Sequence, residues 1–132
     1  MQRTETATRP TASKERLRRA WSEEFAQAQA ARGRGDSAGE WGHLERAHIL
    51  SQPMAVPHVR THVAMIGSAL RRRDRREIVG QLFRLVVAGP GSLTGRYPVG
   101  NTGGANVSAF APMAIPADLQ AILEGEPQEA TR

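Results

Sequence analysis

The four histidines of the chain lie close together in one segment, and their type and spacing could support metal chemistry. Glu45 and His48 are three residues apart and His58 and His62 are four apart, so each pair shares one face of a helix. Imidazole nitrogens and a carboxylate oxygen are ligands that Zn²⁺ and similar divalent ions accept. His43 is turned well around the predicted helix from His48 and is the weakest candidate. We therefore predict a divalent metal site, with zinc as the first choice, formed by Glu45, His48, His58 and His62.

Two prolines determine how these pairs are positioned. Pro53 and Pro57 lack a backbone N–H and bias the residue before each of them away from helix, although Pro57 can open a new helix. This pattern predicts one helix that ends near Ser51 and a second that starts near Val56. A short connection favours an antiparallel hairpin, in which side chains of facing helices can converge on one ion.

A second interpretation needs no metal. The same histidines and Glu45 could hydrogen-bond across the hairpin and hold its register. The protein would then be a helical-hairpin interaction module, with its loop or its arginine-rich edge holding a protein partner. An arginine run can meet an acidic partner, but it also fits a solvated helix end. The edge consists of Arg71, Arg72, Arg73, Arg75 and Arg76.

Composition excludes several classes of protein. The 132 residues are enough for a single domain, and the absence of cysteine excludes thiolate catalysis, disulfides and cysteine zinc sites. No apolar run is long enough to span a membrane, and the charged N-terminus lacks the apolar core of a signal peptide. We therefore expect a cytoplasmic protein of bacterial type. The net charge is +5, but aromatic residues make up only 5%, which is too few for a nucleic-acid stacking platform.

Catalytic motifs are not evident, and no enzymatic activity is assigned. No nucleophile elbow precedes an Asp and a His in the order of the serine hydrolases. A zinc protease of the H-E-x-x-H type would need Glu at position 59, where this chain has Val59. A di-iron carboxylate centre would need more carboxylates and a second E-x-x-H motif. Metal sensing, storage or handling is therefore the expected role of the site.

Helical periodicity predicts an all-α fold. We expect helices over residues 14–32, 37–51, 56–73, 74–87 and 117–123, within a domain of residues 14–124. Residues 1–13 are expected to form a disordered arm and residues 125–132 a frayed tail. Trp41–Ala47 and Val79–Leu85 share Gly, Leu and Arg at an offset of 38 residues, which indicates two antiparallel hairpins of tetratricopeptide-like form.

Apolar residues at helical spacing mark the faces that we expect to be buried. The first helix presents Leu17, Ala20, Trp21, Phe25, Ala28 and Ala31, and the second presents Trp41, Leu44 and Ala47. The third presents Val59, Val63, Ile66, Ala69 and Leu70. The fourth presents Ile78, Leu82, Leu85 and Val86.

The segment from Gly89 to Pro116 is rich in Gly and Pro, and its apolar residues predict an ordered loop packed on the helices. These residues are Leu93, Tyr97, Val99, Val107, Phe110, Met113 and Ile115. If the loop closes over the histidines, Tyr97 and Asn101 become partners of the metal ligands, while Asn101 and Asn106 hold the turns. The glycines at 100, 103 and 104 do not form a phosphate loop, because no lysine or following helix accompanies them.

Three motifs together resemble a known family. They are W-x-H-L-E-R-A-H-I-L, P-H-x-x-x-H-x-x-M and G-S-L-T-G-R-x-P-x-G-N-T-G-G-x-N-V-S, and the resemblance covers about residues 21–123. The chain is similar to a small bacterial family known as domain of unknown function number 3703. The resemblance implies no activity, because the family has none assigned.

Overall fold

The computed structural model describes residues 9–96, 98–105, 107 and 112–125, and in that part of the chain it contains helices and no strand. The helices are α1 (Arg9–Gly33), α2 (Ser37–Ser51), α3 (Ala55–Arg72), α4 (Arg75–Thr94) and α5 (Ala117–Glu124). The predicted all-α class is confirmed. None of these helices is both long enough and apolar enough to cross a membrane.

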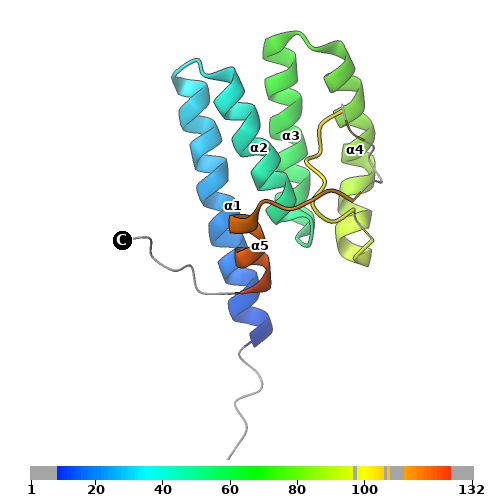
Figure 1. Cartoon of the computed structure of the whole chain (residues 1–132). Helices are drawn as coiled ribbons and strands as arrows, with labels where there is room; N and C mark the ends of the chain where they lie inside the picture. The colour runs from blue at the N-terminus through cyan, green and yellow to red at the C-terminus, as the bar shows by residue number, and fades with distance from the viewer. Residues whose placement is uncertain (1–8, 97, 106, 108–111, 126–132) are drawn as a thin grey trace, which may run out of the picture.

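The helices stand in a row of two hairpins (Figure 1). α1 pairs with α2, α3 pairs with α4, and α2 packs against α3 to join the hairpins. After α4 the chain returns beside α3 and α4, then crosses α2 and reaches α5, which packs on α1 and α2. The predicted helical bundle is therefore present, while its tetratricopeptide-like character stays a prediction.

Aspartates cap the second helix of each hairpin. Asp36 Oδ1 accepts a hydrogen bond of 2.8 Å from the amide of Gly39, and Asp74 Oδ1 accepts one of 3.0 Å from the amide of Glu77. Each bond satisfies an amide that the first turn of a helix leaves without a helical partner. The starts of α2 and α4 are thus set locally, by one side chain each.

Two helix boundaries differ from the prediction by more than one residue. α1 begins at Arg9 rather than Lys14, and α4 continues to Thr94 rather than ending near Val87. Pro90 lies inside α4, although a proline there removes one backbone hydrogen bond and its ring crowds the carbonyl four residues earlier; its fixed φ is compatible with a helix. Gly95 then ends the helix in the left-handed conformation, with φ of 70°. The connection to α5 is correspondingly shorter than predicted.

The apolar core lies between α1, α2 and α5. Its buried side chains come mainly from the predicted stripe of α1 and from α2, with Leu119 of α5 completely enclosed. Trp21 also donates a hydrogen bond of 2.9 Å from Nε1 to Thr61 Oγ1, which ties α1 to α3. The buried members of this core are Leu17, Ala20, Trp21, Ala47, Ile49, Leu50, Met54 and Leu119.

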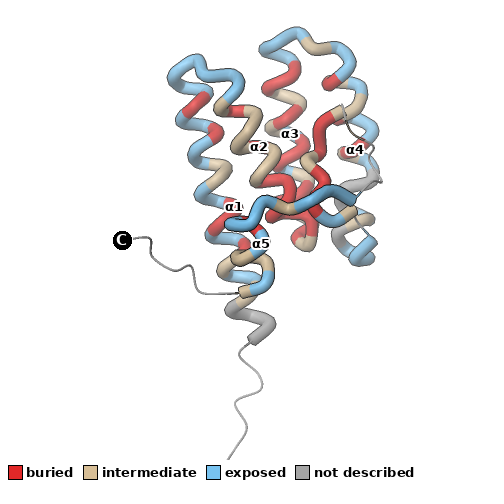
Figure 2. Tube along the Cα trace, in the orientation of Figure 1, coloured by how far each residue is buried: buried red, intermediate tan, exposed pale blue. Residues whose placement is uncertain are grey.

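The predicted apolar faces of α3 and α4 are wrong in part. Val63 and Leu70 of α3 are 54% and 57% exposed, and Leu82 and Val86 of α4 are 51% and 75% exposed. Figure 2 shows which parts of α3 and α4 are buried. Besides Met65 and the predicted Ala69, the buried residues of these helices are mostly polar. They include His58, Thr61, His62 and Ser68 of α3, and Glu77, Gln81 and Arg84 of α4. Periodicity alone failed here because it assumes that the buried face is the apolar one.

The docking of α5 provides a test of this packing. Leu119→Ala removes a completely buried side chain, so it should lower the free energy of unfolding by about 2–5 kcal/mol. The matched change Leu93→Ala, at a residue that is 79% exposed, should alter it by less than about 0.5 kcal/mol. Urea unfolding followed by circular dichroism measures both. Equal effects of the two changes would show that α5 does not belong to the folded core.

Candidate metal centre

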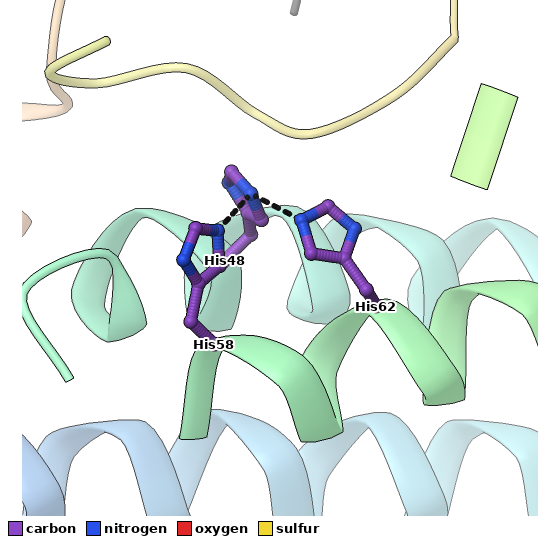
Figure 3. A group of neighbouring side chains, drawn as sticks. All are labelled: His48, His58 and His62. Carbon is purple, nitrogen blue, oxygen red and sulfur yellow. Dashed lines mark hydrogen bonds between the residues drawn. The ribbon is translucent and has the colours of Figure 1, made fainter. Parts of the chain in front are cut away.

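Three of the four histidines meet between α2 and α3. His48 comes from the last turns of α2, and His58 and His62 come from the first turns of α3 (Figure 3). Their exposed fractions are 3%, 5% and 2%, so solvent hardly reaches them. This meeting agrees with the antiparallel hairpin that the two prolines predicted.

The Nε2 atoms point toward one another. His48 Nε2 lies 3.0 Å from His58 Nε2 and 3.1 Å from His62 Nε2. One nitrogen from each ring lies within 4.8 Å of the nitrogens of the other two. The His48 ring stands edge-on to both others, at interplanar angles of 66° and 73°. Three potential ligand atoms thus surround one small volume.

The protonation of His48 is determined by its other nitrogen. His48 Nδ1 lies 2.6 Å from the backbone carbonyl oxygen of Asn101, which is itself completely buried. A carbonyl oxygen can only accept, so Nδ1 must carry the proton. In the neutral ring Nε2 then presents a lone pair toward His58 and His62.

The position of the proton on His62 is determined in the same way, by the partner of its Nδ1 atom. Its Nδ1 lies 2.6 Å from Gln81 Oε1. The amide cannot be turned the other way, because Gln81 Nε2 donates to Glu77 Oε1 at 2.7 Å and to the carbonyl of Gly103 at 2.6 Å. His62 Nδ1 is therefore the donor, and in the neutral ring His62 Nε2 also presents a lone pair.

Two lone pairs consequently face each other across 3.1 Å, at His48 Nε2 and His62 Nε2. His58 can donate an Nε2 proton to His48, but in the neutral cluster no proton lies between His48 and His62. Only a positively charged species between the rings would make this contact favourable. The hydrogen bonds around the cluster thus prepare it for a cation.

A short loop covers the cluster and is held by its backbone. Asn101 Oδ1 accepts from the amide of Gly103 at 2.9 Å and from Arg84 Nη1 at 3.3 Å, and Glu77 accepts from the amide of Ala105 at 2.9 and 3.0 Å. Gly103 has φ of 83°, and a Cβ there would lie 2.7–2.9 Å from the His48 ring. Glycine is required at this position by both conformation and space.

The predicted packing of this loop through apolar side chains is wrong for Val99, which is 52% exposed, and for Leu93, which belongs to α4 and is 79% exposed. Ile115 does pack against the apolar core, and Tyr97 and Phe110 lie outside the described residues. Gly100, Asn101, Gly103 and Gly104 are buried instead. Small residues let the backbone itself approach the histidines, and polar side chains of α4 satisfy its amides and carbonyls.

Burial dominates the electrostatics of the centre. It holds the pKa of His48 well below its usual value, and the neighbouring His62 and His58 lower it further. Burial also lowers the pKa of His62 to about 4, against a smaller opposing effect of its hydrogen bond with Gln81. Both rings are therefore neutral at pH 7, which is the form that binds metal ions. Burial lowers the pKa of Arg84 too, while the nearby Glu77 raises it.

Glu45 and His43 lie apart from the three histidines. Glu45 Oε1 accepts a hydrogen bond of 2.9 Å from Trp41 Nε1, and Glu45 is not part of the convergent group. Burial raises its pKa, as does Glu77 to a smaller extent. His43 Nδ1 pairs with Glu24 at 2.7 Å on the other side of α2. Glu45 as a metal ligand stays a prediction.

The remaining predicted residues fall in two groups. Tyr97 and Asn106 lie outside the described residues. In the arginine edge, Arg71 pairs with Glu40, and the guanidinium of Arg72 lies 4.5 Å from the ring centre of Trp41. Arg73 ends α3 with φ of 57°, and Arg75 and Arg76 are exposed at the start of α4. A partner for this edge stays a prediction.

The polar face of α4 was not predicted from the sequence. Glu77, Gln81 and Arg84 follow the spacing i, i+4, i+7, which places them on one side of a helix. That pattern was visible beside the apolar one. It marks the side that supports the histidines and the loop.

The fit of Gly103 against His48 can be tested by two glycine-to-alanine substitutions that should change the free energy of unfolding in opposite directions. Gly103→Ala should lower the free energy of unfolding by about 2 kcal/mol or more, from a strained φ and a clash with the ring. Gly42→Ala, in the middle of α2 with open space around it, should raise it by about 0.5–1 kcal/mol. Thermal unfolding measures both. If Gly103→Ala leaves the free energy of unfolding unchanged, the loop does not pack against the histidine cluster.

Acid should destabilise the metal-free protein. Between pH 6.5 and 4 the unfolded chain binds a proton at His62 that the folded protein, with a pKa of about 4, does not. Stability is thus complete above pH 6.5 and falls as the pH is lowered, by about 2 kcal/mol at pH 5 from His62 alone. Urea unfolding of chelator-treated protein at pH 7 and pH 5 measures the loss. His62→Gln should reduce it and His43→Gln should not. An unchanged loss in His62→Gln would contradict the assignment.

Comparison with known proteins gives one family. No curated protein and no solved structure matches the chain significantly. The model of the family described as "Protein of unknown function (DUF3703)" matches residues 15–123, which include the three histidines, the covering loop and most of α5. The chain therefore belongs to this family of proteins of unknown function.

Proposed function

We propose that this protein binds a divalent metal ion through the Nε2 atoms of His48, His58 and His62. One observation carries the proposal: His48 Nε2 and His62 Nε2, both held as acceptors by groups behind their rings, face each other at 3.1 Å. A cation accepts both lone pairs. Zinc is the first ion to test, because neutral imidazoles suit it and it needs no further charge at the site.

The distances fit an ion of this kind. Zinc–nitrogen bonds of about 2.0–2.1 Å place neighbouring nitrogens of a tetrahedral site about 3.3 Å apart. The separations of 3.0 and 3.1 Å are within a few tenths of an ångström of that value. Two ligands of one ion can be at most about 4.2 Å apart. The nitrogens of the group lie within 4.8 Å of one another, so the widest pair must approach by up to about 1.5 Å to reach the tetrahedral spacing.

The surrounding groups support the ligands. Metal-bound histidines commonly donate their second N–H to a carbonyl, a carboxylate or a polar chain that leads to one. Here His48 donates to the carbonyl of Asn101, and His62 donates to Gln81, which is bonded to the carboxylate of Glu77. The charge of Arg84 opposes an added cation, and Glu77 offsets it. The support is thus built into α4 and the loop.

Three protein nitrogens leave a fourth position on a tetrahedral ion. Glu45, three residues before His48 on the same helix, is the remaining protein candidate for it, and water or a small anion is the other. The burial of all three imidazoles suits retention of the ion rather than rapid exchange. We therefore place the role in metal sensing, storage or handling, and we expect it to operate in the cytoplasm.

Metal binding should stabilise the folded protein. At free Zn²⁺ a hundred times its Kd the gain is about 2.7 kcal/mol, because only the folded state has the site. Chelator-treated protein without a histidine tag, titrated with Zn²⁺ and followed by thermal unfolding, measures the gain. His62→Gln and His58→Gln should abolish it. His43→Gln removes a histidine outside the cluster and should keep it. The absence of any shift in the parent protein, or its loss in His43→Gln as well, would refute the proposal.

A metal-free interaction module is the second candidate function. The observation that favours it is a run of exposed apolar side chains on α4: Val79, Leu82 and Val86 are 68%, 51% and 75% exposed. Exposed apolar patches of this kind are typical of binding surfaces. In that case the histidines would form only a structural hydrogen-bond network. Failure of the metal titration would make this the leading interpretation.

A further inference from the structure

A second pocket lies at the opposite end of the helices from the histidines. It has a volume of about 230 Å³ and is formed where the α1–α2 turn meets the last turns of α3. Ser37, at the start of α2, precedes His48 by about 16 Å along the helix axis, taking about 1.5 Å per residue. The two sites are therefore separate. The pocket is lined by Arg32, Gly35, Ser37, Glu40, Ser68, Arg71 and Arg72.

The hydroxyl of Ser68 in the wall of this pocket has no hydrogen-bond partner among the described residues. Ser68 is completely buried, with an exposed fraction of 0%. A buried hydroxyl without a partner costs about 1–3 kcal/mol, and alanine would serve helix packing equally well. The serine therefore indicates a polar ligand that occupies the pocket.

The charges around Ser68 specify the sign of that ligand. Arg32, Arg71 and Arg72 contribute three positive charges, and Glu40, which pairs with Arg71, contributes one negative charge. The stacking of Arg72 on Trp41 holds its guanidinium near the site. The N-terminus of α2, a helix of 15 residues, adds the positive end of its dipole at Ser37. The pocket is thus positive and carries a hydroxyl donor.

We infer that this pocket binds a tetrahedral oxyanion such as phosphate, held by Ser68, Arg32 and Arg72. Planar guanidinium groups and a hydroxyl match the oxygen atoms of such an ion. The volume exceeds what one water molecule requires. Because the Ser68 hydroxyl is shielded from solvent, a phosphate oxygen can contact it only after neighbouring side chains move. This site does not depend on the proposed metal centre.

Phosphate titration of the full chain in the presence of a chelator tests the inference. Isothermal calorimetry with inorganic phosphate gives Kd, and sodium chloride of equal ionic strength is the control. Ser68→Ala should weaken phosphate binding by about tenfold or more, as expected for a hydrogen bond to a charged group. Arg32→Gln should weaken it by a similar factor. Arg18→Gln removes the same charge from an exposed position of α1 that does not line the pocket, and it should leave Kd within about twofold.

Stability in phosphate-free buffer separates a ligand site from a structural serine. Ser68→Ala removes a hydroxyl without a partner, so without phosphate the melting temperature should stay equal or rise. A fall in melting temperature together with an unchanged phosphate Kd would show that Ser68 has an internal structural role, and would overturn the inference. So would a parent protein that responds to phosphate no more than to chloride, in which case water fills the pocket.

Discussion

The packing of α2, α3 and α4 buries a group of polar side chains, and each of them needs a hydrogen-bond partner inside the protein. The rest of the structure depends on this requirement. His48, His58, His62, Gln81 and Glu77 are all nearly inaccessible to solvent. The free-energy cost of one buried polar atom without a hydrogen-bond partner is a large part of the net stability of a small domain. Each of these side chains therefore constrains the others. The chain of bonds from His62 through Gln81 to Glu77 joins the facing sides of α3 and α4.

The covering loop is a consequence of the same constraint. The carbonyl of Asn101 and the carbonyl of Gly103 complete the hydrogen bonding of His48 and Gln81, and Glu77 in return accepts from the amide of Ala105. A backbone that must approach an imidazole ring closely cannot carry a Cβ at Gly103. Polar contacts with the histidine cluster thus hold residues 101–105 of the loop, while the apolar Val99 next to them is half exposed.

The two candidate sites divide the molecule by charge. At the histidine end, neutral rings and the carboxylate of Glu77 provide acceptors for a cation. At the other end, arginines of α1 and α3 surround a hydroxyl donor and the start of α2. The antiparallel arrangement produces this division, because it places the end of α2 beside the start of α3 at one end and the reverse at the other. The apolar core of α1, α2 and α5 lies to the side of both sites and holds the helices that form them.

Local signals in the sequence determined most of the helices and the meeting of the three histidines. Pro53 and Pro57 marked the connection, and the spacing of His48, His58 and His62 indicated one shared site. These features act within a few residues of the chain, so their effects can be predicted without knowledge of the tertiary structure. The apolar stripe of α1 was also correct, because it faces a conventional apolar core.

Only the tertiary structure decided which faces of α3 and α4 are buried and what the loop contacts. Whether Leu82 or Gln81 is buried depends on the partners that each side of the helix meets. For Gln81 these include His62 and Gly103, which are 19 and 22 positions away along the chain. The tautomers of His48 and His62 likewise follow from Asn101 and Gln81, which are remote in sequence. Ser68 became notable only when its surroundings showed no partner among the described residues. Hydrogen-bond satisfaction in a buried cluster is a property of the assembled structure, and no local pattern of residues encodes it.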